Sequence, residues 1–401
     1  MDAYLQKPLA VGNYRLANRV VFQPMEGCDC NEDGSPHPLT VEKYKKAAQS
    51  GAALVWFEAN AVCPEGRTNA RQMMLTKENI DAFRALVAEM RRIAQKECGM
   101  RQVLILQLTH SGRQSIRPMI AYRNSVYEAT RPVTDDCIVS DEYLDTLAAH
   151  YAASARLAME AGFDGVDVKS CHGYLFQELL SAYTRPGRYG GSFENRSRLF
   201  LDCVHAVRRV LPAHALLTSR LSVSDMVPYP NGFGTDANGQ PDLSEPDRLI
   251  GALCEAGIQI LNVTVGNPYY NPHVNRPYRQ GGYLPPETAD VGLQRFEIIE
   301  RHIKERFPTL VVVGSGLSYY REDLIEQSER LLQDGICDLV GYGRMTLAYP
   351  TFYRDHLRGC FSAKKCCLAC SKCTVLMRNK RVSGCAVFHE YYRNLYKEIT
   401  K

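Results

Sequence analysis

The sequence predicts a (β/α)8 barrel followed by a cysteine-rich C-terminal extension. Eight short apolar segments rich in β-branched residues alternate with longer helical segments, which is the order that builds a closed parallel sheet. Polar residues follow these strand candidates at the end where barrel enzymes carry their chemistry. From Gly359 onward the alternation stops and cysteines become frequent. We therefore expect a barrel over residues 1–358 and a separate cysteine-rich segment over residues 359–401.

The strand candidates have the spacing of one barrel of ordinary size. They lie at residues 19–22, 54–57, 103–106, 165–168, 216–220, 258–263, 310–313 and 338–340. Amphipathic patterns between them predict helices at residues 80–95, 143–161, 197–210, 247–256 and 290–307. A doubly wound open sheet is the alternative. It is disfavoured because no G-x-G-x-x-G motif follows the first strand.

The composition excludes several classes of protein. The chain is 45% hydrophobic, has no run of eighteen apolar residues and has no cationic start followed by an apolar stretch, so we expect a cytoplasmic protein without a membrane segment. The net charge is only +4, and the basic residues are interleaved with acidic ones, which argues against nucleic-acid binding. The cysteine count of 15 is odd and the chain is long, so a reducing compartment is favoured over a disulfide scaffold.

The fourth predicted strand runs directly into a polar loop that holds Lys169, His172 and Tyr174. Loops after barrel strands lie at the carboxyl end of the barrel, where catalytic side chains collect. We therefore predict that these three residues are catalytic. The alternatives are a structural ion pair of Lys169, with Asp167 or Glu26, and a packed core tyrosine at position 174.

The other strand ends together predict a flavin site. A flavin ring needs hydrogen-bonding groups in its plane and a cation near the edge that becomes anionic on reduction, and Gln107 and Arg220 offer these groups. Two glycine loops after the last two strands suit a phosphate, which barrel enzymes usually hold there. The predicted cofactor-binding residues are Pro24, Met25, Glu26, Ala59, Gln107, Arg220, Ser315, Gly316, Gly343 and Arg344.

The C-terminal extension contains a dense cysteine motif. Cys367, Cys370, Cys373 and Cys385 form C-x2-C-x2-C-x11-C. Four thiolates, three of them from one tight loop, suit a [4Fe–4S] cluster. Zinc is the alternative, although zinc motifs more often split into two separated pairs. The neighbouring Cys366 leaves the identity of the first ligand open.

The motifs LANRVVFQPM, QLTHSGR, HGYL, YGGSFENR and GYGR, spread between about Pro8 and Pro350, resemble as a set the old yellow enzyme family of NADH:flavin oxidoreductases. The cysteine motif after the barrel is similar to that of the family's iron–sulfur branch, the 2,4-dienoyl-CoA reductases and trimethylamine dehydrogenases. The resemblance implies FMN, with the arginine of the second glycine loop, Arg344, on its phosphate. Members of that branch continue into FAD and NAD(P) domains, which we expect this chain to lack.

The resemblance also implies an activity. We expect an ene-reductase that reduces the C=C bond of an α,β-unsaturated carbonyl, carboxylate or thioester, with hydride from flavin N5 and a proton from Tyr174. Electrons would come from NAD(P)H or from an external donor such as a ferredoxin, a flavodoxin or a reductase subunit. The alternatives are an amine dehydrogenase or demethylase, which would favour an aromatic cage with Trp, and a non-catalytic electron carrier or zinc-stabilised barrel. The oligomeric state is left open, a homo-oligomer included.

Two positions depart from the family pattern. Lys169 stands where the family carries a histidine, so an ammonium replaces one imidazole and we expect the activating group of the substrate to be recognised differently. Glu26 stands where the family often has a small hydroxyl or thiol residue near flavin N5. The segment 267–286, rich in Tyr, Pro and Gly, is predicted to form a long loop over the mouth of the site.

Overall fold

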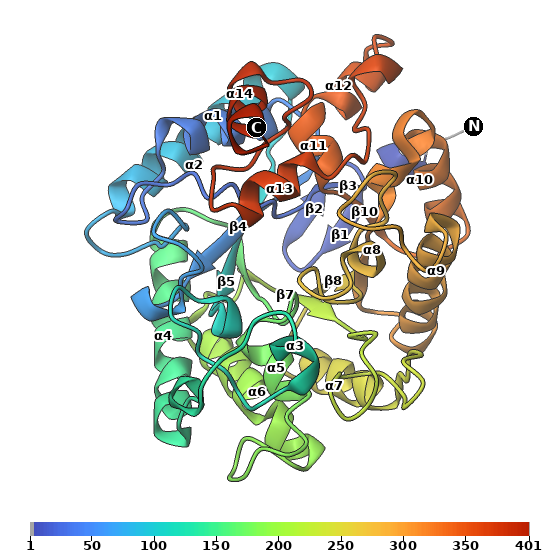
Figure 1. Cartoon of the computed structure of the whole chain (residues 1–401). Helices are drawn as coiled ribbons and strands as arrows, with labels where there is room; N and C mark the ends of the chain where they lie inside the picture. The colour runs from blue at the N-terminus through green and yellow to red at the C-terminus, as the bar shows by residue number, and fades with distance from the viewer. Residues whose placement is uncertain (1–3, 401) are drawn as a thin grey trace.

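A computed structural model describes residues 4–400 and contains a closed barrel of eight parallel strands (Figure 1). Around the barrel the strand order is β10-β3-β4-β5-β6-β7-β8-β9. The strands are β3 (Val20–Phe22), β4 (Leu54–Ala61), β5 (Val103–Thr109), β6 (Gly165–Val168), β7 (Leu216–Ser222), β8 (Ile260–Thr264), β9 (Val311–Gly314) and β10 (Leu339–Tyr342). All eight predicted strands are therefore confirmed, and the open-sheet alternative is wrong.

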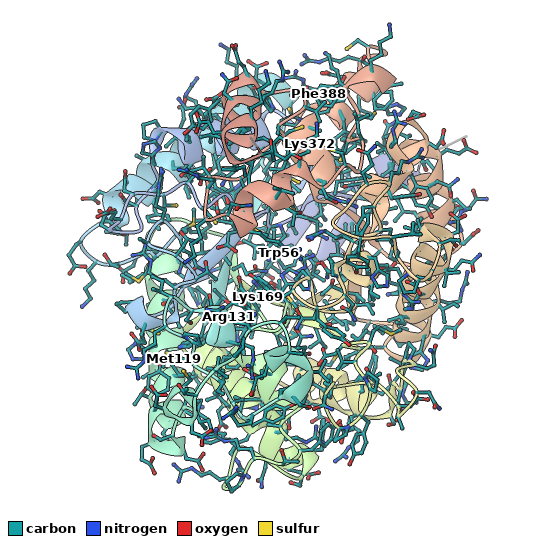
Figure 2. The ribbon with its side chains drawn as sticks, in the orientation of Figure 1. Trp56, Met119, Arg131, Lys169, Lys372 and Phe388 are labelled. Atoms are coloured by element: carbon teal, nitrogen blue, oxygen red, sulfur yellow. The ribbon has the colours of Figure 1, made fainter. Side chains whose placement is uncertain are left out.

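The barrel strands are almost entirely buried, because their outer face packs on helices and their inner face fills the barrel. The inner cluster includes Leu54, Trp56 and Ile105. Leu54 and Trp56 are two residues apart on β4, and Trp56 is paired with Ile105 on β5. A short hairpin of β1 (Leu9–Val11) and β2 (Tyr14–Leu16) adds Val11 and Leu16 to this cluster. Trp56 is thus a packing residue of the barrel interior (Figure 2).

Helices ring the barrel, and the five predicted ones are confirmed as α2 (Ile80–Cys98), α4 (Asp141–Glu160), α6 (Phe193–Val210), α7 (Ser244–Glu255) and α9 (Ala289–Arg306) (Figure 1). Two further helices, α1 (Pro38–Ala48) and α10 (Leu324–Gln333), fill the remaining connections. They are the shorter helices, of 11 and 10 residues, so their periodicity covers few turns. No helix within residues 4–400 is long and apolar enough to cross a membrane.

The last part of the chain folds back onto the barrel. It contains α11 (Arg344–Ala348), α12 (Phe352–Leu357), α13 (Lys372–Arg378) and α14 (Glu390–Ile399). The Ser383 N–H donates to the Gly27 carbonyl (2.7 Å), and the Arg279 N–H donates to the Ala369 carbonyl (3.0 Å). These bonds fix the cysteine-rich segment to the loop after β3 and to the loop after β8, both at the carboxyl end of the barrel.

Candidate active site

One cavity at the carboxyl ends of the strands gathers the predicted site. It encloses about 1170 Å³, counted with its opening to solvent. Every predicted catalytic and cofactor-binding residue lines it: Lys169, His172, Tyr174, Pro24, Met25, Glu26, Ala59, Gln107, Arg220, Ser315, Gly316, Gly343 and Arg344. Of the four motif cysteines, Cys373 also lines this cavity. Segments separated by more than 300 residues of sequence therefore share one site.

The catalytic loop is a tight turn between β6 and α5 (Leu175–Leu180). His172 and Gly173 both have φ of 68°, and left-handed backbone is costly for a residue with a Cβ, so the turn needs support. The Gln177 side chain supplies it by accepting a bond from the Gly173 N–H (2.5 Å). The turn places Tyr174 at the N-cap of α5, with its ring perpendicular to that of His172 at 6.5 Å between centroids.

Lys169 is buried, and within residues 4–400 it makes no direct ion pair with Asp167 or Glu26, although the charges of both act on it. Its Nζ instead lies 3.6 Å from the centroid of the Tyr174 ring, a cation–π contact. Burial lowers the pKa of Lys169, and Arg220 acts in the same direction. Burial also lowers the pKa of His172 well below its usual value, with Lys169 and Arg220 adding to the shift, so His172 is neutral near pH 7.

Glu26 forms a hydrogen bond with Tyr174. The Tyr174 hydroxyl donates to Glu26 Oε2 (3.3 Å), and the Thr68 hydroxyl donates to Glu26 Oε1 (2.9 Å). Burial raises the pKa of Tyr174 well above its usual value, and the Glu26 carboxylate and Tyr269 raise it further. Tyr174 therefore keeps its proton at neutral pH, as a proton donor must.

Gln107 on β5 and Arg220 on β7 lie on the two strands that flank β6, and both line the cavity. Gln107 Nε2 donates to Asp167 Oδ1 (2.9 Å), which orients the amide so that its carbonyl oxygen is free to accept a bond. Burial raises the pKa of Asp167 to about 7. The Arg220 Nε is buried without a hydrogen-bond partner in the described chain. A buried guanidinium N–H without a partner is costly, and the edge of a flavin would satisfy it.

The opposite end of the cavity fits a phosphate. Arg344 is buried; its Nη2 donates to the Pro277 carbonyl (2.6 Å), while its Nη1 has no partner within residues 4–400. Gly343 is crowded, because a Cβ there would lie 2.9 Å from the Met25 sulfur. Gly316 has φ of 86°, which favours glycine. Free guanidinium N–H groups beside bare backbone are what a phosphate binds, so the residues present fit FMN.

The cavity also contains residues that the sequence did not single out. The predicted loop after β8 contributes Tyr269, Asn275 and Arg276, and the C-terminal segment contributes Met377 and Arg378. The loop at 267–286 was expected over the mouth of the site, but its sequence did not show which side chains point inward. No local pattern in the sequence indicates that α13 lines the cavity, because the cysteines of this segment predict only a cluster site.

The motif cysteines are neighbours, but a metal site is not formed by them in the described part of the chain. Among residues 4–400 no three His, Cys, Asp or Glu side chains are arranged to hold a metal ion. Burial raises the pKa of Cys385 to about 11, and the charges of Cys367 and Cys373 add to that shift, so these three thiols lie near one another. The Cys367 sulfur accepts the Ala369 N–H (3.4 Å). N–H bonds to sulfur are one of the features that tune iron–sulfur clusters, and the four cysteines are candidate ligands by residue type, although their side chains are not grouped as a metal site in the described residues.

Cys366 has a different environment from Cys367. Its thiol contacts the Ser362 carbonyl (3.8 Å), and the charges nearest to it, after burial, are Glu322 and Arg321. Cys367 instead lies near Arg344, Cys373 and Cys370. This difference favours Cys367 over Cys366 as a member of the cysteine cluster.

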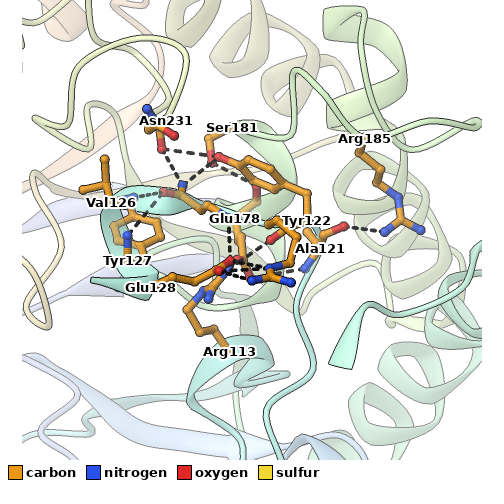
Figure 3. A network of polar contacts seen from close by, with 12 residues as sticks. Arg113, Ala121, Tyr122, Val126, Tyr127, Glu128, Glu178, Ser181, Arg185 and Asn231 are labelled. Atoms are coloured by element: carbon orange, nitrogen blue, oxygen red, sulfur yellow. Dashed lines mark hydrogen bonds and ion pairs between the residues drawn. The ribbon is translucent and has the colours of Figure 1, made fainter. Parts of the chain in front are cut away.

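A buried polar network connects α5 to the turn after β5 (Figure 3). Arg113, from the turn after β5, forms an ion pair with Glu178 on α5, and Arg113 Nη2 donates to the Tyr122 carbonyl (3.0 Å). The Tyr122 hydroxyl donates to Ser181 Oγ (3.1 Å) just beyond α5. Since Tyr174 is the N-cap residue of α5, this network fixes Tyr174 relative to the nearby strand ends.

The fold and the site define a class of protein, a barrel oxidoreductase with a flavin site at the carboxyl ends of its strands. The chain belongs to the NADH:flavin oxidoreductase / NADH oxidase family, whose model matches residues 4–240. An NADPH dehydrogenase of Bacillus pumilus is 32% identical over 368 residues, covering 88% of this chain and 94% of the relative. An NADH oxidase of Thermoanaerobacter brockii is 26% identical over 372 residues, which are 90% of this chain and 52% of the relative. The chain thus spans about half of the latter protein.

Solved structures show the same fold. A 2-naphthoyl-CoA reductase in complex with 2-naphthoyl-CoA has a TM-score of 0.78 at 19% identity, covering 96% of this chain and 57% of that one. Histamine dehydrogenase from Rhizobium sp. 4-9 has a TM-score of 0.70 at 18% identity, covering 96% of this chain and 52% of that one. Cover of 96% extends the likeness beyond the barrel into the cysteine-rich segment.

Proposed function

We propose that the chain is an FMN- and [4Fe–4S]-dependent ene-reductase acting on an activated alkene. The observation that carries this proposal is the convergence, in one cavity, of a protonated tyrosine, a neutral histidine and a lysine with the side chains that fit a flavin ring and a phosphate. Bound FMN would supply hydride chemistry to the alkene. A relative, 12-oxophytodienoate reductase 1 of Oryza sativa subsp. japonica, is 27% identical over 87% of this chain and 85% of its own length, and its name describes such a reaction.

Each residue of the catalytic loop has a role in this proposal. Lys169 and His172 hold the carbonyl or carboxylate oxygen of the substrate, so that their N–H groups stabilise the negative charge that grows there during reduction. Tyr174 delivers a proton to the carbon that does not receive hydride. Lys169 and Tyr174 are buried and His172 is partly buried, which limits the access of water to the reacting atoms.

The cysteine-rich segment is the proposed port for electrons. Cys367, Cys370, Cys373 and Cys385 would hold a [4Fe–4S] cluster, which passes single electrons. Because Cys373 lines the same cavity as the flavin residues, such a cluster would lie beside the flavin. The donor is proposed to be NAD(P)H or an external ferredoxin, flavodoxin or reductase subunit. The NADPH dehydrogenase relatives favour the nicotinamide.

The amine dehydrogenase alternative has less support from the site. A cage for a methylated ammonium is built from aromatic faces, preferably Trp. The single Trp of the chain, Trp56, is buried inside the barrel, and the aromatic residues that line the cavity are Tyr174 and Tyr269. The charged side chains that line the cavity are five cations and one carboxylate, and this excess of positive charge repels a cationic amine.

The test is direct. Protein purified without oxygen should show flavin absorption, release FMN on denaturation and contain about four irons per chain. The flavin, reduced with dithionite, should be reoxidised by at least one member of a panel of enones, enoates and enoyl thioesters. A preparation without flavin bands, or a reduced flavin that no alkene reoxidises, would exclude the ene-reductase.

A further inference from the structure

The cavity carries an excess of positive charge. Its lining includes the five cationic side chains Lys169, Arg220, Arg276, Arg344 and Arg378, against the single carboxylate Glu26. That carboxylate already accepts bonds from Thr68 and Tyr174. Unpaired cations in a cavity attract and hold anions.

The proposed flavin and alkene account for three of the five cations. Arg220 would face the flavin ring, Arg344 its phosphate, and Lys169 the activating group of the alkene. Arg276 and Arg378 remain without a role. They come from two different segments, the loop after β8 and the last residue of α13.

Arg276 is an unsatisfied cation. Within residues 4–400 its guanidinium forms no hydrogen bond and no ion pair, and its Nε is buried. Burial, with repulsion from Arg344 and Arg378, lowers the pKa of Arg276 to about 10, and Cys373 and Tyr269 act in the opposite direction. The folded chain therefore holds this charge in an unfavourable place, which a bound anion would relieve.

Arg378 is fixed to the loop that carries Arg276. Its Nη2 donates to the Pro268 carbonyl (2.6 Å), so the end of α13 is tied to the loop that carries Arg276. Pro268 precedes Tyr269, which is a neighbour of Tyr174: Tyr269 raises the pKa of Tyr174, and Tyr174 lowers that of Tyr269. The charges of Arg344 and Arg378 and the Tyr269 side chain all act on Arg276, so these groups share one region of the cavity.

We propose that Arg276 and Arg378 form a carboxylate-binding subsite, and that the substrate of this enzyme carries a free carboxylate. This inference rests on the proposed function and adds the substrate class. A guanidinium offers paired N–H donors that match the two oxygens of a carboxylate. The flavin phosphate already has Arg344 and two glycine loops, which leaves Arg276 and Arg378 for a second anion.

The test uses the flavin-loaded protein and two non-reducible probes, 3-phenylpropanoate and its neutral amide, 3-phenylpropanamide. Isothermal titration calorimetry measures their binding whether or not an alkene is reduced. Because a charge-assisted hydrogen bond contributes roughly a tenfold or larger change in affinity, Arg276→Gln and Arg378→Gln should each weaken the acid by about tenfold and reduce the preference for acid over amide. The control is Arg279→Gln, an exposed arginine on the same loop that does not line the cavity and should leave both affinities unchanged.

The outcomes separate this inference from the proposed function. Equal affinities of the unaltered protein for acid and amide would overturn the subsite. So would variants that bind FMN more weakly, measured by equilibrium dialysis, yet retain the preference for acid, because Arg276 would then be a phosphate ligand. Failure of every alkene to reoxidise the reduced flavin would instead exclude the ene-reductase, and the calorimetric preference for the acid would still be measurable.

Discussion

At the scale of single residues, the bond from the Tyr174 hydroxyl to Glu26 gives the family's proton donor an unusual partner. The carboxylate raises the pKa of the Tyr174 phenol, so the phenol stays protonated. A substrate that takes the proton would have to replace this hydrogen bond to Glu26, since both residues line the cavity. If Tyr174 is the proton donor, as proposed, Glu26 would act on proton delivery.

Tyr174→Phe should separate the two half-reactions. Loss of a general acid slows proton transfer by roughly a hundredfold or more, so reoxidation of the reduced flavin by an alkene should slow by that factor. Reduction of the flavin should be unchanged, because it needs no proton from Tyr174. Stopped-flow absorbance measures both rates, and an unaltered rate of reoxidation would contradict the assignment.

Glu26→Gln should move the alkaline limit of reoxidation to lower pH. The carboxylate raises the pKa of Tyr174, so its removal brings that pKa down, and the phenol then loses its proton at a lower pH. The rate of reoxidation, followed up to the highest pH at which both proteins stay folded, should therefore fall at a lower pH in the variant, which keeps the burial that also raises this pKa. The control is Glu65→Gln, which removes a carboxylate bonded to Tyr143 (2.9 Å) outside the cavity. The same profile in all three proteins would rule out the coupling.

At the scale of elements, the position of α5 depends on the buried pair of Arg113 and Glu178 (Figure 3). Both side chains are at most 3% exposed, so neither charge can turn to water if its partner is removed. Since Tyr174 caps this helix, the pair connects stability to the geometry of the catalytic loop.

Arg113→Met should lower the free energy of unfolding by about 3–5 kcal/mol, the usual cost of leaving one charge of a buried pair alone. Denaturant titration measures it. Arg123→Met, which breaks solvent-exposed pairs with Glu128 and Asp135, is the control and should cost far less. Adding Glu178→Leu to Arg113→Met should recover much of the loss, and a loss no larger than that of the control would show that the pair contributes little.

At the scale of the whole molecule, the cysteine-rich segment completes the cavity of the barrel. It adds Cys373, Thr374, Met377, Arg378 and Ser383 to the lining, and Cys366 and Cys367 to the core cluster. A cluster held there would be separated from the flavin by a short distance through protein. The sequence pattern changes at residue 359, where we expected the barrel to end. Residues on both sides of that position line the same cavity.

Cys370→Ser should impair electron entry more than substrate reduction. If the cluster carries electrons to the flavin, anaerobic reduction of the flavin by reduced methyl viologen should slow by roughly tenfold or more, whereas reoxidation by an alkene should be nearly unaffected. Cys360→Ser, an exposed cysteine outside the motif, is the control and should alter neither rate. Iron-free protein from anaerobic cells, or equal losses in both variants, would contradict the electron path.

The sequence was sufficient for the features that depend on local pattern. The bounds of strand β6 agree with the prediction at both ends. The strand alternates β-branched residues with Asp167 and is bounded by a helix end and by a polar loop, so the sequence marks where it begins and ends. The residues at the strand ends were predicted to converge, since the carboxyl ends of parallel strands meet at one rim. Short helices such as α1 and α10 were not predicted, because few turns give a weak period.

Only the tertiary structure decided which distant side chains meet. The bond between Glu26 and Tyr174 joins residues 148 positions apart, and Arg276 and Arg378 approach each other from a loop and from the C-terminal segment. The different environments of Cys366 and Cys367 were decided in the same way. Such contacts depend on loop conformation and on the packing of α13 against the barrel, and no periodicity in the sequence encodes these. The sequence by itself therefore determined the barrel and the rim that carries the chemistry, and the fold determined which charges that rim leaves unpaired.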